Sequence, residues 1–64
     1  MNLDENRLVR TIYDYESNDE KLLNFKANEL FIILKDSGDF TYVVNAYGRL
    51  GYIPTNYCES TTVF

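Results

Sequence analysis

The sequence predicts a small all-β barrel built from five short strands. Short runs rich in β-branched and aromatic residues recur along the chain and are separated by clusters of turn residues. With 64 residues the chain has room for one domain and is too short for two thick sheets. A closed or partly closed barrel suits such a chain, because closure removes exposed strand edges.

The first expected strand covers residues 8–13, where Val9, Thr11 and Tyr13 fall on one face. Residues 1–7 contain too little apolar material to pack against it. We therefore expect a lead-in over residues 1–7, a domain over 8–60 and a tail over 61–64.

One long helix is a competing interpretation of residues 19–34. Ser17 and Glu20 have the spacing of a helix capping box, and apolar residues recur after them at helical intervals. Against a helix, the segment ends in a run of β-forming residues, and Asn24 and Asn28 favour turns and left-handed backbone. Both interpretations remain open on these residues, and strands are favoured.

The later strands are each bounded by turn residues. Residues 36–39 form a turn cluster, and residues 45–48 form a hairpin loop in which Gly48 takes a positive φ. A last strand contains Cys58. The other expected strands cover residues 29–35, 40–44 and 49–53.

Alternation along these strands predicts the side chains that fill the barrel. Thr11 is expected at a tight spot among them. The expected inner residues are Val9, Leu23, Phe25, Phe31, Ile33, Val43, Ile53 and Cys58.

The residue inventory disfavours several classes of function. Ten acidic and six basic residues give a net charge of −4, which disfavours binding to nucleic acid. Without histidine and with Cys58 as the single cysteine, the chain offers neither a His-assisted nucleophile nor a thiolate metal cage. No apolar run approaches the ~20 residues that span a bilayer. We expect no enzyme activity, no cofactor, no metal, no membrane span and a buried, inert Cys58, in a cytoplasmic domain of a larger protein.

Residues 51–57 combine two tyrosines, a proline and an asparagine. Pro54 has a fixed φ and no N–H, so it ends strand pairing and holds the flanking rings in one arrangement. Such a segment suits a rigid aromatic ledge at a binding groove. The alternative is a proline-containing turn whose tyrosines serve as amphipathic cover.

Four motifs, in order and spacing, resemble the Src homology 3 (SH3) family. They are Tyr13-Asp14-Tyr15, residues 23–29, Gly38-Asp39 before an aromatic residue, and residues 51–57. The resemblance runs from about residue 9 to 59 and counts against the helix. It implies an SH3-type barrel of five strands with one 3-10 turn at residues 55–57. The loops that the family names are then the RT loop (14–26), the n-Src loop (36–39) and the distal hairpin (45–48).

The resemblance also implies binding of proline-rich segments in the polyproline II conformation. Tyr13 and Tyr57 would wall one proline slot, and Tyr15, Pro54 and Tyr57 would form much of a second. Asn56 would donate to the ligand backbone, and Tyr52 would border a third, specificity pocket. The expected peptide-binding residues are Tyr13, Tyr15, Phe40, Tyr52, Pro54, Asn56 and Tyr57.

Two positions depart from the family's usual pattern. Phe40 stands where the family usually has tryptophan, so the ring is kept and the indole donor is lost. Leu22 stands where the family often has a carboxylate that binds a ligand arginine. Acidic loop residues near the pocket would compensate, or they are acidic only because the loops are solvated. These residues are Glu16, Asp19, Glu20, Asp36 and Asp39.

We therefore expect a monomeric protein–protein interaction module in an adaptor, signalling or cytoskeletal protein. Its expected partners are proline-rich segments that carry a basic residue. The alternative is an atypical SH3 domain that docks a folded partner or a neighbouring domain through another surface. Tyr42, Tyr47 and Leu50 are the candidate exposed residues of that surface.

Overall fold

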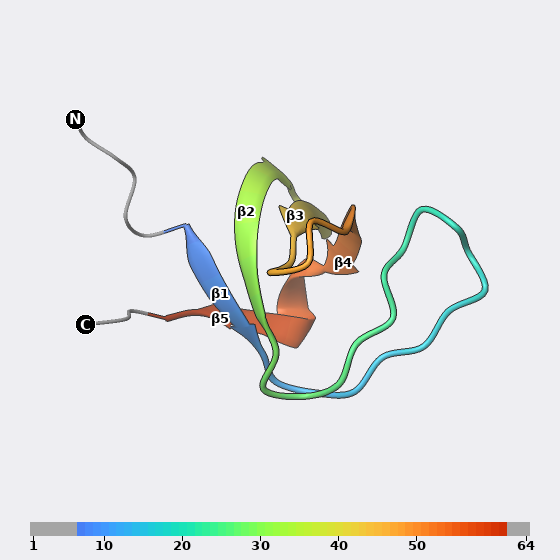
Figure 1. Ribbon diagram of the computed structural model, residues 1–64, viewed down its shortest axis with the longest axis horizontal. Coiled ribbons are helices and arrows are strands. Elements are labelled where there is room, and N and C mark those ends of the chain that lie inside the picture. Colours follow the sequence, from blue (N-terminus) through green and yellow to red (C-terminus); the bar gives the residue numbers. More distant parts are fainter. Residues whose placement is uncertain (1–6, 62–64) are drawn as a thin grey trace.

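The computed structural model describes residues 7–61. These residues form one antiparallel sheet of five strands in the order β4-β3-β2-β1-β5, with a single 3-10 turn, η1 (Figure 1). The predicted all-β fold is confirmed. The elements are β1 (Leu8–Thr11), β2 (Leu30–Ser37), β3 (Phe40–Val44), β4 (Leu50–Pro54), η1 (Thr55–Tyr57) and β5 (Cys58–Ser60).

The expected lead-in and tail fall almost entirely on residues 1–6 and 62–64, which lie outside the described residues. Only Arg7 and Thr61 of those two segments are described.

Strand β2 belongs to both halves of the barrel. Ile32 pairs with Leu8 of β1 on one side and with Val44 of β3 on the other. The register with β3 shifts between Ile33 and Lys35, so Leu34 is an extra residue in β2. A bulge of this kind bends the strand and increases its twist, and Figure 1 shows β2 as a curved ribbon. The curvature folds the sheet around one core.

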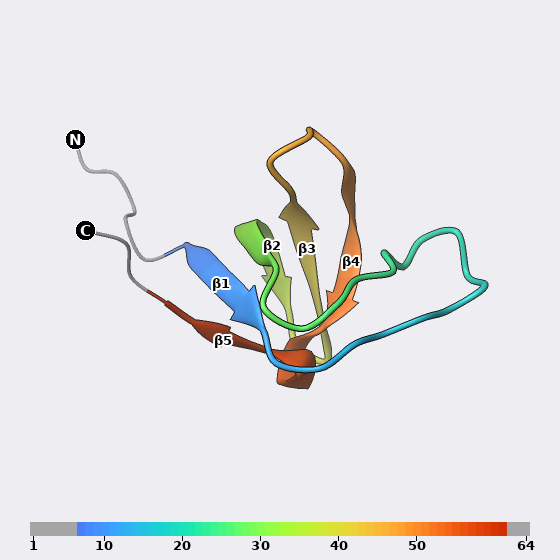
Figure 2. The same cartoon turned by 60° about the horizontal axis from the view of Figure 1, so that its bottom comes forward.

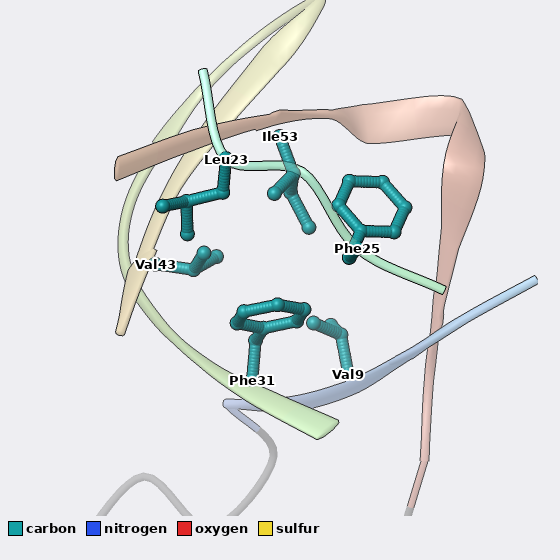
Figure 3. Packing of buried hydrophobic residues seen from close by; sticks show 6 residues of the cluster. All are labelled: Val9, Leu23, Phe25, Phe31, Val43 and Ile53. Carbon is teal, nitrogen blue, oxygen red and sulfur yellow. The ribbon is translucent and has the colours of Figure 1, made fainter. Parts of the chain in front are cut away.

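The core consists of six buried apolar side chains that point toward one another (Figure 3). Ile33 and Cys58 were expected among them but are only half-buried at the edge of this cluster. The bulge beside Ile33 moves that residue toward the rim. Cys58 begins β5, the short strand at the sheet's end, so it lacks a neighbour on its far side. The buried six are Val9, Leu23, Phe25, Phe31, Val43 and Ile53.

Thr11 occupies the tight position that alternation predicts. It is 0% exposed. Its hydroxyl donates to the carbonyl of Lys26 at 2.6 Å and accepts from the backbone N–H of Glu29 at 2.8 Å. The backbone N–H of Asn28 donates to the carbonyl of Thr11, and Asn28 has a φ of 71°. An asparagine tolerates this left-handed conformation, so the loop closes on β1 without a glycine.

The long helix considered for residues 19–34 is wrong. Ser17 accepts a hydrogen bond from the backbone N–H of Asp19, and Asp19 accepts one from that of Lys21. The pattern that resembled a helix cap thus stabilises local turns. Tyr15 and Phe25 exchange two backbone hydrogen bonds and close the RT loop, which extends away from the sheet (Figure 2).

Two element ends differ from expectation. Strand β1 stops at Thr11, short of residue 13, because its neighbours β5 and β2 begin opposite residues 11 and 10 and offer no further partner. Strand β2 continues to Ser37, so the expected four-residue turn is a two-residue loop. Gly38, with φ of 80°, is its first residue, as a type II′ hairpin requires. At the distal hairpin, Gly48 has the expected positive φ, 82°.

Candidate functional site

Three tyrosine rings meet where the base of the RT loop passes η1. The ring of Tyr57 lies edge-on to that of Tyr13, with centroids 5.4 Å apart, and edge-on to that of Tyr15 at 5.3 Å. The backbone N–H of Ile12 donates to the carbonyl of Tyr57 at 2.7 Å and ties the two segments together. The structure thus brings together three predicted site residues that are up to 44 positions apart along the chain.

These rings are supported by the core beneath them. Tyr15 is stacked on buried Phe25, with centroids 5.4 Å apart and planes 25° apart. Phe25 in turn lies edge-on to Tyr57 at 6.4 Å. Tyr15 and Tyr57 are consequently half-buried, whereas Tyr13 is 56% exposed and offers most of its ring to a ligand.

A depression at the start of η1 is lined by all three expected non-tyrosine members of the site, Phe40, Pro54 and Asn56. Phe40 opens β3 and pairs with Pro54, the last residue of β4. Phe40 is 41% exposed, whereas Pro54 is buried. The lining residues are Gly38, Asp39, Phe40, Pro54, Thr55 and Asn56.

Thr55 links the two sides of this depression by hydrogen bonds, although the sequence did not mark it as a site residue. Its hydroxyl donates to the carbonyl of Gly38 at 2.6 Å and lies 2.7 Å from the hydroxyl of buried Thr41. Its backbone N–H donates to the carbonyl of Asp39 at 2.9 Å. The n-Src loop and η1 are thereby held together, and Asn56 is left exposed between them. The sequence did contain a signal for this contact, namely the polar residue Thr41 at an inner strand position and Thr55 directly after Pro54.

Tyr52 lies beside the RT loop. Its backbone N–H donates to the carbonyl of Lys21, and its carbonyl accepts from Leu23, both at 2.9 Å. Leu22 forms a bridge with Tyr52 and is half-buried there. The ring of Tyr52 packs against that of Tyr42 at 4.9 Å, so Tyr42 is half-buried and not a free surface residue. The pairing of the two tyrosines follows from strand register, which the sequence did not reveal.

The acidic loop residues are exposed. Glu16, Asp19, Glu20 and Asp39 all have exposed side chains. Asp19 uses one carboxylate oxygen to accept from Lys21, and Asp36 accepts a longer bond of 3.4 Å from Gly38. Within residues 7–61, no group of three potential metal ligands lies close enough together to hold an ion.

Cys58 departs from the expected buried thiol. It is half-buried, and its Sγ donates to the carbonyl of Thr55 at 3.4 Å. Burial, and next the negative charge of Asp36, raise the pKa of the thiol above its ordinary value. The described residues also contain no helix long and apolar enough to cross a membrane.

With this geometry, comparison with known proteins decides the family. The chain matches the family model described as variant SH3 domain over residues 8–60. The chain belongs to the SH3 family. The predicted SH3-type barrel is therefore confirmed, and the SH3 fold is a module of protein interaction.

Similar SH3-containing proteins come from several organisms. The chain is 34% identical over 59 residues to the LIM and SH3 domain protein Lasp of Drosophila melanogaster, covering 89% of the chain and 9% of that protein. It is 35% identical over 52 residues to the myosin IB heavy chain of Dictyostelium discoideum, covering 80% of the chain and 5% of that protein. This SH3 chain thus spans less than a tenth of the length of either relative.

A solved structure has the same fold. The C-terminal SH3 domain of myosin IB from Entamoeba histolytica matches with a TM-score of 0.81 and 24% identity, covering 92% of this chain and 98% of that one. A second structure of that domain, bound to the EhFP10(GEF) peptide, matches with the same TM-score and coverage.

Proposed function

We propose that this SH3 domain binds proline-rich segments in the polyproline II conformation through its aromatic surface. We define this surface as Tyr13, Tyr15 and Tyr57 together with the depression beside Phe40. The observation that carries the proposal is the edge-on contact of Tyr57 with both Tyr13 and Tyr15, at 5.4 and 5.3 Å. Rings at steep angles leave slots between their faces, and a preformed left-handed segment can fill such slots at little entropic cost.

Each residue of the surface then has a role. Tyr13 and Tyr57 wall one proline slot, and Tyr15, Pro54 and Tyr57 form much of the second. Exposed Asn56 donates its side-chain amide to a ligand carbonyl, as a tyrosine hydroxyl can also do. Phe40 separates the second slot from a third pocket, which Tyr52 borders.

The proposed third pocket combines an apolar wall with an acidic rim. Leu22 and Tyr52 form the wall, and neither carries a charge. A basic ligand residue would therefore pair with the exposed carboxylates of the loops. Exposed ion pairs contribute ~0–1 kcal/mol each and weaken with salt, so these charges favour a basic residue only modestly. The carboxylates proposed for this role are Glu16, Asp19, Glu20 and Asp39.

The proposed setting is a cytoplasmic adaptor, signalling or cytoskeletal protein in which this chain acts as a monomeric module. Support comes from relatives such as the actin cytoskeleton-regulatory complex protein SLA1 of Mycosarcoma maydis, 34% identical over 61 residues. The chain covers 5% of that protein. We infer that the chain contributes peptide binding to such a protein and catalyses no reaction.

A titration with synthetic peptides tests this function. A proline-rich peptide with one arginine should bind in isothermal titration calorimetry, and Tyr13→Ala should weaken it by about tenfold or more, as loss of a contact aromatic does. Tyr47→Ala is the control, because Tyr47 is 93% exposed on the distal hairpin and outside the aromatic surface. Equal binding by the two variants, or no binding by the parent chain, would refute the proposed function.

A further inference from the structure

A second apolar surface lies on the outside of the sheet. Direct pairing puts Leu8, Ile32, Val44 and Leu50 side by side across four strands, since Ile32 pairs with Leu8 and Val44, and Val44 pairs with Leu50. Directly paired residues share one face of a sheet. Leu30 and Leu34 extend this row along β2. We call these six residues the outer apolar face.

Four of its members expose about half of their side chains to solvent. The exposed fractions are 48% for Leu30, 50% for Ile32, 48% for Leu34 and 53% for Leu50. Residues 30–34 are apolar at every position, a pattern typical of strands covered on both faces. Here Phe31 faces the core while its neighbours face solvent. Contiguous exposed apolar patches are typical of interaction sites.

The outer apolar face is separate from the aromatic surface. Val44 and Leu50 lie at the far end of the β3–β4 pair from Phe40 and Pro54, which adjoin η1 (Figure 2). Val44 lies four residue steps along β3 from Phe40, a distance of about 13 Å at ~3.3 Å per step. One ligand can therefore occupy the aromatic surface while another covers the outer face.

The backbone around Ile32 limits what can dock there. Strand β2 has β1 on one side and β3 on the other, so its hydrogen-bonding groups are already used. An added strand would find no backbone partners at this position. A helix satisfies its own backbone and needs only an apolar stripe to cover a sheet face.

Charge further defines the partner. Cationic residues adjoin members of the outer apolar face, Lys35 next to Leu34 and Arg49 next to Leu50. Within residues 7–61, Lys35 and Arg49 form no ion pair. A third cation, Arg10, lies opposite Leu30 but is already bound to Glu59 and Asn28. The acidic RT loop projects away from the sheet (Figure 2), although Lys21 and Leu23 near its end bind the backbone of Tyr52 in β4.

We propose that the outer apolar face docks an amphipathic helix of a partner protein whose apolar stripe is bordered by carboxylates. Ile32 and Leu50 supply the apolar centre of the contact. Lys35 and Arg49 pair with the carboxylates at its edges, which selects acidic helices over basic ones more than it adds affinity.

The test uses two helical peptides of about 18 residues, a length that supports helix formation in water. Both carry the same leucine stripe, bordered by glutamate in one peptide and by lysine in the other. The glutamate peptide is expected to bind at least about tenfold more tightly at low salt. In NMR spectra of the ¹⁵N-labelled chain, it should shift the amides of Ile32 and Leu50 and leave Tyr13 and Tyr57 unchanged.

Matched variants complete the design. Ile32→Thr and Leu50→Thr replace outward apolar groups with a residue that favours strands, so the fold should persist while binding falls at least about tenfold. Arg49→Glu should reduce the preference for the glutamate peptide. Tyr47→Ser and Tyr13→Ala are controls that should leave this binding unchanged.

Four outcomes would overturn the proposal. The first is equal affinity for the two peptides, and the second is no binding up to about 1 mM peptide, which corresponds to a binding free energy of about 4 kcal/mol. The third is a set of NMR shifts confined to the aromatic surface. The fourth is sedimentation of the chain as a dimer that Ile32→Thr and Leu50→Thr dissociate. The last would identify a second copy of this chain as the occupant. None of them bears on binding of proline-rich peptides, which is measured separately.

Discussion

The rings of Tyr15 and Phe25 are stacked, with centroids 5.4 Å apart and planes 25° apart, and they join the aromatic surface to the core. Tyr13 has no such support and is 56% exposed. We expect Tyr15→Ala to lower the free energy of unfolding by about 1–3 kcal/mol and Tyr13→Ala by less than about 1 kcal/mol. Urea unfolding of both variants measures this difference. Equal losses would mean that the stacked pair does not stabilise the fold.

Gly51 is required by close packing. A Cβ added there would lie 2.6 Å from Cγ of Leu23, which is buried. Gly51→Ala should therefore destabilise the fold by about 1–3 kcal/mol, as overpacking does. In a Leu23→Ala background the same change should cost much less, because the space is then free. Additive losses in this double-mutant cycle would exclude the steric explanation.

Phe40→Trp should strengthen binding to a proline-rich peptide. The substitution restores an indole N–H donor beside the second slot while a ring is kept. One neutral hydrogen bond contributes ~0.5–1.5 kcal/mol, which is roughly threefold to tenfold in affinity. Calorimetry with one peptide and both chains measures the change. Unchanged affinity would indicate that the ligand does not reach this position.

Charge on the two acidic loops should affect binding only weakly. Glu20→Gln together with Asp39→Asn should weaken binding of an arginine-containing proline-rich peptide by about tenfold at most, because both side chains are exposed. The loss should shrink as salt rises. Leu22→Asp should act in the opposite direction and favour arginine. Titrations at low and high salt test both effects, and a loss that is independent of salt would count against a charge contact.

The Cys58 thiol should react slowly in the folded state. Its raised pKa lowers the thiolate fraction at neutral pH, and thiolate is the reactive form. The unfolded thiol loses its proton first as pH rises, near pH 8.5, so the unfolded state then binds fewer protons and stability falls. Cys58→Ser should flatten this decline. Alkylation rates measure the slow reaction of the thiol, and urea unfolding between about pH 7 and pH 10 measures the fall in stability. Equal alkylation rates with and without denaturant would contradict the slow reaction.

Alternation and turn chemistry predicted most of the core and the loops. Val9, Phe31 and Val43 are buried because each strand has only one inner face, which a period of two reveals. The left-handed Asn28 and the positive φ of Gly48 follow from local residue preferences.

What the sequence did not predict depends on pairing between distant segments. The bulge at Leu34 moves Ile33 toward the rim, and strand register packs Tyr42 against Tyr52. Pro54 is buried, although the composition of residues 51–57 suggested a surface segment. The hydrogen bonds of Thr55 likewise appear only when η1 and the n-Src loop are brought together.

An NMR titration of the ¹⁵N-labelled chain with an arginine-containing proline-rich peptide tests peptide binding most directly. The largest shifts are expected at the backbone amides of Tyr13 and Tyr57 and at the side-chain amide of Asn56, with the amides of Ile32 and Leu50 unchanged. Shifts confined to Ile32 and Leu50 would contradict recognition through the aromatic surface. The absence of any shift at about 1 mM peptide, which corresponds to a binding free energy of about 4 kcal/mol, would contradict it as well.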